Sequence, residues 1–179
     1  MELISLIFEN LFIQYESKEE LTKWVCHILK FYFNSHISQY NYNNNDLKQN
    51  NSNKFLNQGN LYLKRNNYIE ARKYFELAAK QSNSEALCNL GIMYSAGQGV
   101  KQNFLKAKEY FELAAKQSNS DAFLNLGFMY HYGKGVKQSF QKAKEYFELA
   151  AKKNNSEALY NLGIYYSAGK GVEQNYLKA

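Results

Sequence analysis

Apolar and polar residues recur along the C-terminal part of this chain with a period of 36 positions. Ala86, Ala122 and Ala158 each begin nearly the same string of residues, and residues 84–119 match residues 120–155 at 25 of 36 positions. Self-similarity at a period of roughly 20 to 50 residues is typical of arrays built from one repeated supersecondary unit. The sequence therefore predicts a repeat protein.

Within each period, the apolar residues follow two helical patterns, which we call helix A and helix B. Both patterns place apolar residues at intervals of three and four, as expected for one buried helix face. In the unit 84–119 this face comprises Ala86, Leu87, Leu90, Gly91 and Tyr94 in helix A, and Phe104, Ala107, Tyr110, Phe111 and Ala114 in helix B. The predicted fold is all-α, an α-α superhelix (solenoid) of helix-turn-helix repeats with an N-terminal helical segment.

Residue types at the helix ends agree with this division. The residues predicted to cap helix A are Ser84, Ser120 and Ser156, and those predicted to cap helix B are Asn103, Ser139 and Asn175. The A-to-B turns of the three units that begin at residues 84, 120 and 156 contain Gly-x-Gly, without the third glycine and the preceding strand of a phosphate-binding loop. Glycine inside a helix costs about 1 kcal/mol relative to alanine. Gly91, Gly127 and Gly163 therefore predict a close approach of helices A and B.

The rest of the chain divides by composition. Residues 1–33 contain two segments with helical apolar spacing, Leu3 to Tyr15 and Leu21 to Phe33, and are predicted to form a helical hairpin. This hairpin could cap the solenoid, bind another chain or form a separate module. Residues 34–54 contain eight asparagines and are predicted to be a low-complexity linker. The repeats then occupy residues 55–83, 84–119, 120–155 and 156–179, of which the first is shorter and the last is truncated.

The fourth unit stops after the first turn of its helix B, at Ala179. We expect this to leave the apolar face of its helix A, with Leu162 and Tyr166, incompletely covered. Either more repeats follow, or another subunit makes an end-to-end contact there.

Charge and reactive residues exclude several classes of function. The net charge is +6, but lysines alternate with glutamates on the repeat helices, which is typical of a solvated surface and not of specific nucleic-acid binding. The two cysteines have no metal-site spacing, which favours a reducing, cytoplasmic location without metal or cofactor. The three histidines have no catalytic partner at suitable spacing, and no stretch is long enough for a membrane span. The sequence therefore predicts that the protein is not an enzyme.

The string A-x-x-N-L-G-x-x-Y-x-x-G-x-G-V followed by K-A-x-x-Y-F-x-x-A-A resembles the Sel-one-like repeat family, which is related to the tetratricopeptide repeats. The resemblance is strong over residues 84–179, whereas residues 55–83 resemble a shorter, tetratricopeptide-like unit. It implies an α-solenoid that acts as an adaptor in multiprotein assemblies. The chain departs from the family pattern after helix B, where Ser82, Ser118 and Asn154 replace a glycine.

The candidate binding site is the side of helix A opposite its core, which lines the concave surface in tetratricopeptide-like stacks. The repeats differ most on this side. We expect protein or peptide partners to contact a partly apolar groove formed by Cys88, Ile92, Leu124, Phe128, His131, Tyr132, Tyr160 and Ile164, flanked by Asn57, Asn89, Asn125 and Asn161. By resemblance to tetratricopeptide clamps, these asparagines could pair with a peptide backbone. Alternatively, each asparagine bonds within its own repeat and the apolar residues pack adjacent A helices.

The predicted function is therefore a non-enzymatic scaffold or adaptor for protein–protein interaction. One alternative is a β-lactamase-like or other hydrolase activity, as described for cysteine-rich relatives of the family. Those relatives carry two cysteines per repeat, whereas Cys88 is the only cysteine in these repeats. The other alternative is RNA binding through the basic outer faces.

Overall fold

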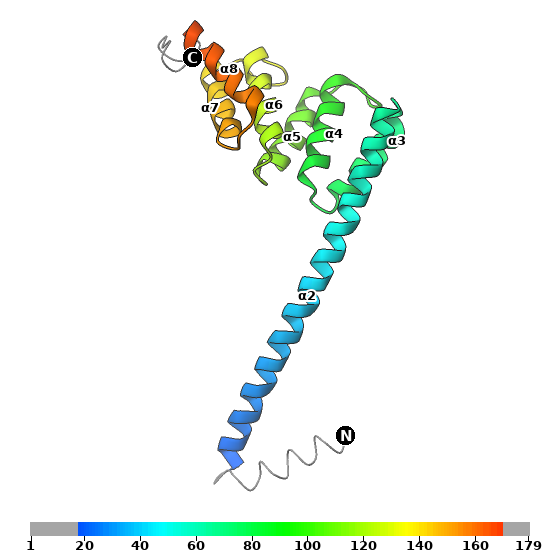
Figure 1. Ribbon diagram of the computed structural model, residues 1–179, viewed down its shortest axis with the longest axis vertical. Coiled ribbons are helices and arrows are strands. Elements are labelled where there is room, and N and C mark those ends of the chain that lie inside the picture. The colour runs from blue at the N-terminus through cyan, green and yellow to red at the C-terminus, as the bar shows by residue number, and fades with distance from the viewer. Residues whose placement is uncertain (1–17, 170–179) are drawn as a thin grey trace. The chain divides into compact units, whose positions relative to one another are not determined.

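The computed structural model describes residues 18–169, and all regular structure in this range is helical. The helices are α2 (Lys18–Lys64), α3 (Tyr68–Ala79), α4 (Ser84–Ala96), α5 (Phe104–Ala115), α6 (Ser120–Tyr132), α7 (Phe140–Ala151) and α8 (Ser156–Ala168). The chain divides into two units, residues 1–47 and residues 48–179. The second unit contains the repeats, shown as successive helical hairpins in Figure 1. The all-α prediction is confirmed.

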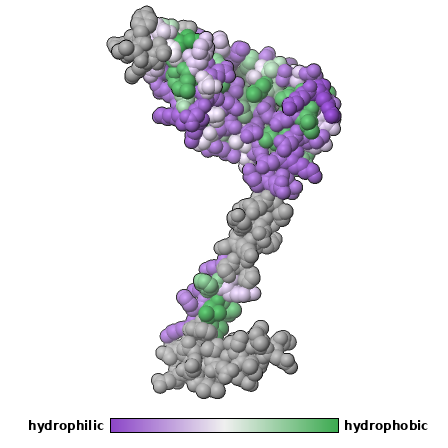
Figure 2. Space-filling view, viewed as in Figure 1, coloured by the Kyte–Doolittle hydropathy of each residue, from purple (hydrophilic) through white to green (hydrophobic). Residues whose placement is uncertain are grey.

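In the repeat unit, helices of type A and type B alternate along the chain. The A helices are α4, α6, α8 and the C-terminal end of α2. The B helices are α3, α5 and α7. Each of the helices α4 to α7 packs against the helix before it and the helix after it. Figure 2 shows a mainly hydrophilic surface on the displayed side of this unit, with hydrophobic residues in separate patches.

The A helices begin with an asparagine cap. Asn83, Asn119 and Asn155 accept hydrogen bonds from the backbone N–H groups of Ala86, Ala122 and Ala158, at 3.0, 2.9 and 3.0 Å. The prediction of serine caps is therefore wrong by one position, because Ser84, Ser120 and Ser156 are the first helical residues. Asparagine and serine are about equally good caps, so residue type alone could not choose between neighbours.

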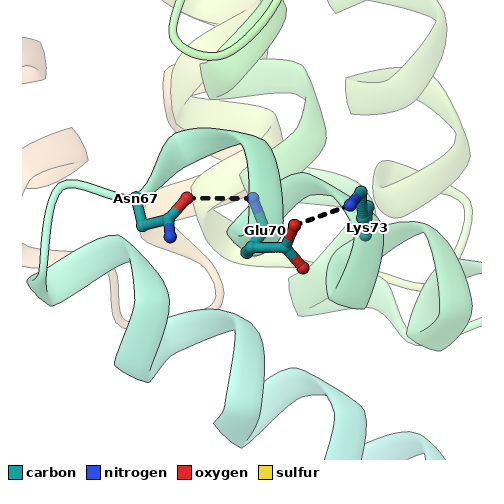
Figure 3. Close-up of polar contacts among 3 residues, drawn as sticks. All are labelled: Asn67, Glu70 and Lys73. Carbon is teal, nitrogen blue, oxygen red and sulfur yellow. Dashed lines mark hydrogen bonds and ion pairs between the residues drawn. The ribbon is translucent and has the colours of Figure 1, made fainter.

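The B helices begin as predicted where the structure describes them. Asn103 caps α5 and Ser139 caps α7, accepting from the N–H groups three residues later; Asn175 lies outside the described residues. In the first repeat, Asn67 caps α3 by accepting from the N–H of Glu70 at 3.3 Å. The Glu70 carboxylate in turn forms an ion pair with Lys73 at 2.6 Å, as Figure 3 shows. This acid in the first turn also complements the helix dipole.

The segment predicted to be a linker is helical in the structure. Residues 34–54 belong to α2, which continues to Lys64 as helix A of the first repeat. The segment contains no proline or glycine, the two residues that disfavour a helix most. Its many asparagines do not prevent a helix, because each costs only up to about 0.7 kcal/mol relative to alanine. Its end joins the repeat core, because the buried Ser52 hydroxyl accepts from Asn83 Nδ2 at 2.9 Å. Of the predicted hairpin, residues 21–33 are helical within α2, and residues 3–15 lie outside the described range.

One phenylalanine of each described B helix packs against one glycine of the preceding A helix. The pairs are Gly59 with Phe75, Gly91 with Phe111, and Gly127 with Phe147. A methyl group placed on any of these glycines would lie 2.5 Å from the ring Cε1 atom. The rings are at most 1% exposed. The predicted close approach of helices A and B is therefore confirmed at Gly91 and Gly127.

The turns after the helices need left-handed backbone. Gly97, Gly133 and Gly169 follow the A helices with φ between 64° and 73°. After the B helices, Ser82, Ser118 and Asn154 adopt φ of 61°, 60° and 61°. These are the positions where the chain departs from the family pattern, so the departures retain the backbone conformation that glycine would adopt without strain.

The end of α8 differs from the sequence-based expectation. Leu162 is 8% exposed and packs against Phe147 and Ala150 of α7, so the prediction that it is incompletely covered is wrong. Tyr166 is half-buried and donates a hydrogen bond to Glu148 Oε1 at 3.2 Å. Residues of α6 and α7 thus cover Leu162, whereas Tyr166 remains partly exposed.

Candidate functional site

A groove of about 610 Å³ lies along the A helices of the repeat unit. Most of its lining comes from α4 and α6, with Asn60 from α2 and Glu157 from α8. Six of the predicted site residues line it: Cys88, Asn89, Ile92, Leu124, Asn125 and Phe128. The structure thus brings together half of the predicted set.

A smaller cavity of about 300 Å³ adjoins this groove and shares Asn125 and Phe128 with it. We call it the aromatic pocket, because Phe104, Phe111 and Tyr132 also line it. The remaining lining residues are Ser95, Met129 and Lys134. The Lys134 Nζ atom lies 5.4 Å from the centroid of the Tyr132 ring and 5.8 Å from that of Phe104. Both distances are within the range of cation–π attraction.

Ser95 and Met129, from successive repeats, both line the aromatic pocket. One repeat later, their counterparts are His131 and Tyr165, whose Nδ1 and Oη atoms are 2.5 Å apart. The His131 ring also packs edge-on against Phe140, with centroids 5.4 Å apart. His131 therefore lies in a contact between repeats as well as on the predicted face.

Cys88 and Leu124 form the floor of the groove and belong to the core. They are only 4% and 6% exposed, and they pack in clusters with residues of the next A helix. The alternative that such residues pack adjacent A helices describes them well. Burial, with smaller contributions from Asp121 and Glu85, raises the pKa of the Cys88 thiol to about 12. This thiol is protonated at neutral pH and is a poor nucleophile.

The recurring asparagines have different surroundings. Asn125 and Asn161 each donate from Nδ2 to the backbone oxygen four residues earlier, at 2.8 and 2.7 Å, within their own repeat. Asn89 instead donates to Asn60 Oδ1 at 3.4 Å, and Asn57 is exposed on α2. In Asn125 and Asn161 this bond uses one of the two N–H donors and does not involve the amide oxygen.

The remaining predicted residues are exposed. Tyr132 is 60% exposed at the edge of the aromatic pocket. Tyr160 and Ile164, on α8, are 70% and 40% exposed, and they line neither the groove nor the aromatic pocket.

Sequence reasoning missed the acidic residues of the groove. Glu85, Asp121 and Glu157 line it, and they occupy the same position in three successive repeats. Acidic residues are common in the first turn of a helix because they complement the helix dipole, so their place there does not by itself indicate a site. The 36-residue period that brings the recurring asparagines to one face also brings these carboxylates there, and this signal could have identified them.

The outer B helices carry paired charges. Lys108 forms an ion pair with Glu112 at 2.7 Å, and Lys144 pairs with Glu148 at 3.5 Å. Within residues 18–169, no group of three or more histidine, cysteine or acidic residues is placed to hold a metal ion. In the same range, no helix combines the length and apolar character needed to cross a lipid bilayer.

The Sel1 repeat model matches residues 54–83, 84–119, 120–155 and 156–179, which is well over half of the chain. The chain belongs to the Sel1 repeat family. Sel1 repeats are generally protein–protein interaction modules, and proteins of this family are typically non-enzymatic scaffolds.

Solved structures of Sel1 repeat proteins are similar to this chain. A Sel1 repeat protein from Oxalobacter formigenes is 30% identical, with a TM-score of 0.67, and the match covers 72% of this chain and 54% of that one. A protective antigen of uropathogenic Escherichia coli with an SLR fold is 31% identical, with a TM-score of 0.65, covering 72% of this chain and 28% of that one. This chain therefore spans about half of the first relative and less of the second. The comparison with curated proteins finds no match.

Proposed function

We propose that the groove and the aromatic pocket together bind an extended segment of a partner protein, so that this chain acts as a scaffold or adaptor. The observation that carries the proposal is their continuity through Asn125 and Phe128. Their volumes of about 610 and 300 Å³ are within the range typical of ligand sites. Phe128 and Tyr132 supply the aromatic surface that is enriched at the centres of interfaces.

The repeat comparison gives a variant that closes the aromatic pocket. Ser95→His with Met129→Tyr copies the contact between His131 and Tyr165 found one repeat later, and the larger side chains are designed to fill the pocket. A random library of 12-residue peptides is selected on the full chain, and the affinities of the selected peptides are measured by fluorescence anisotropy. We expect the closed-pocket variant to bind them at least tenfold more weakly, without loss of helicity or a lower melting temperature.

The matched control is Leu113→Ala with Leu149→Ala. These equivalent leucines are exposed on the B helices, outside the groove and the aromatic pocket. The control should bind with unchanged affinity. Binding that survives closure of the pocket but is lost in the control would contradict the proposal.

Asn125→Ala tests the role of the asparagines separately. We expect weaker peptide binding with an unchanged melting temperature, because the amide's partner, the Asp121 carbonyl, is close to solvent and can bind water. If this variant unfolds instead, Asn125 has a structural role.

A further inference from the structure

The charge of the groove is opposite to the charge of the chain. The net charge is +6, yet the charged residues that line the groove are Glu85, Asp121 and Glu157, with no lysine or arginine among the lining residues. Low-dielectric walls focus the field of such a row into the cleft. The floor is apolar, with Cys88 and Leu124, so the carboxylates are next to surface that a ligand can bury.

These carboxylates are not part of the ion pairs that the structure describes. In residues 18–169 those pairs lie along α3, α5 and α7. Asp121 accepts a hydrogen bond from Nδ2 of Asn155, the residue that caps α8, at 2.9 Å, and this bond holds the carboxylate in place. Glu85 and Glu157 are exposed.

We propose that the groove selects a basic segment of another protein, with lysine or arginine side chains at the row formed by Glu85, Asp121 and Glu157. This inference rests on the proposed function and specifies the partner's chemistry. An apolar or aromatic side chain of the same segment occupies the adjoining aromatic pocket. A second cation is unfavourable there, because Lys134 already lies over the rings of Tyr132 and Phe104.

Long-range electrostatics alone would give the opposite preference. A chain with a net charge of +6 attracts acidic peptides and repels basic ones at distances up to the Debye length, about 8 Å at physiological salt. A preference for basic peptides must therefore originate from short-range contacts in the groove. Selection of basic peptides therefore indicates recognition in the groove, and selection of acidic peptides indicates nonspecific attraction to the net charge of the chain.

The test uses the 12-residue peptides selected on the full chain. We expect them to be enriched in lysine, arginine and large apolar residues and depleted in aspartate and glutamate. Their affinity is then measured for Glu85→Gln with Glu157→Gln, which leaves Asp121 and its bond to Asn155 intact. The matched control is Glu109→Gln with Glu145→Gln, two exposed and equivalent positions on the B helices with the same change in net charge.

The groove variant should bind the selected peptides at least fivefold more weakly, and the control should stay within twofold of the wild type. An equal loss in both variants, or in neither, would overturn the inference. If the closed-pocket variant abolishes binding but the peptides are neutral or acidic, the proposed function stands and the basic partner does not. If no selected peptide depends on the groove or the pocket, both proposals fail.

Discussion

The repeats 84–119 and 120–155 have nearly the same internal structure but different A-helix surfaces. Their helices have equal lengths, 13 residues for A and 12 for B. The tyrosine pairs Tyr94–Tyr110 and Tyr130–Tyr146 stack in both, each with ring centroids 5.5 Å apart. The A-helix surface, in contrast, has Ile92, Ser95 and Ala96 in one repeat and Phe128, His131 and Tyr132 in the other.

This difference separates the residues that build the fold from those that shape the surface. Shared residues make the close contacts inside each repeat, such as Gly91 with Phe111 and Gly127 with Phe147. Differing residues also change the contacts between repeats, because Ser95 lines the aromatic pocket whereas its counterpart His131 contacts Tyr165 of the next repeat.

The largest expected effect concerns what the two repeats share. Gly91→Ala and Gly127→Ala should each destabilise the protein by up to about 3 kcal/mol, because the new methyl group meets the ring of Phe111 or Phe147 at 2.5 Å. Helix propensity alone predicts the opposite, a gain of about 1 kcal/mol. Urea unfolding followed by circular dichroism measures the change.

Replacing the phenylalanine with a smaller residue provides the control for this prediction. Phe147→Leu should recover part of the stability lost in Gly127→Ala, since the smaller side chain makes room for the methyl group. If alanine at either glycine is stabilising, the close contact between helices A and B does not control packing there.

The second prediction concerns what the repeats do not share. His131→Ser should cost about 1 to 2 kcal/mol, because it removes a hydrogen-bond partner of the Tyr165 hydroxyl, whose side chain is 1% exposed. Ser95→Ala, the matched change in the preceding repeat, should be nearly neutral, since the Ser95 hydroxyl bonds only a carbonyl of its own helix, that of Ile92. Thermal unfolding of both variants checks the difference.

A double-mutant cycle tests whether the cost arises from this pair. His131→Ser should have a much smaller effect in a Tyr165→Phe background, where no hydroxyl needs a partner. Strictly additive losses would show that His131 stabilises the fold through its ring contacts instead.

The sequence predicts contacts inside a repeat better than contacts between repeats. The period and the helical spacing were enough to predict the approach of Gly127 to helix B, because Gly127 and the Phe147 that it contacts lie in one hairpin. They could not predict that Tyr165 contacts His131, 34 positions away, or that Cys88 and Leu124 are covered by the next A helix. A helical wheel describes one helix at a time. It therefore cannot separate the residues of helix A that line the open groove from those that the next A helix buries.

The smallest expected effect concerns the turns that follow the B helices. Ser118→Gly should stabilise the protein by about 0.5 to 1 kcal/mol, because serine has φ of 60° there, a conformation that costs an L-residue about 1 to 2 kcal/mol, offset in part by the greater chain entropy of glycine. Asn154→Gly, at φ of 61° in the next repeat, should gain less, since asparagine tolerates the left-handed region better than serine. Urea midpoints of the two variants measure the difference. A larger gain at Asn154 than at Ser118 would mean that backbone strain does not determine the stability of these turns.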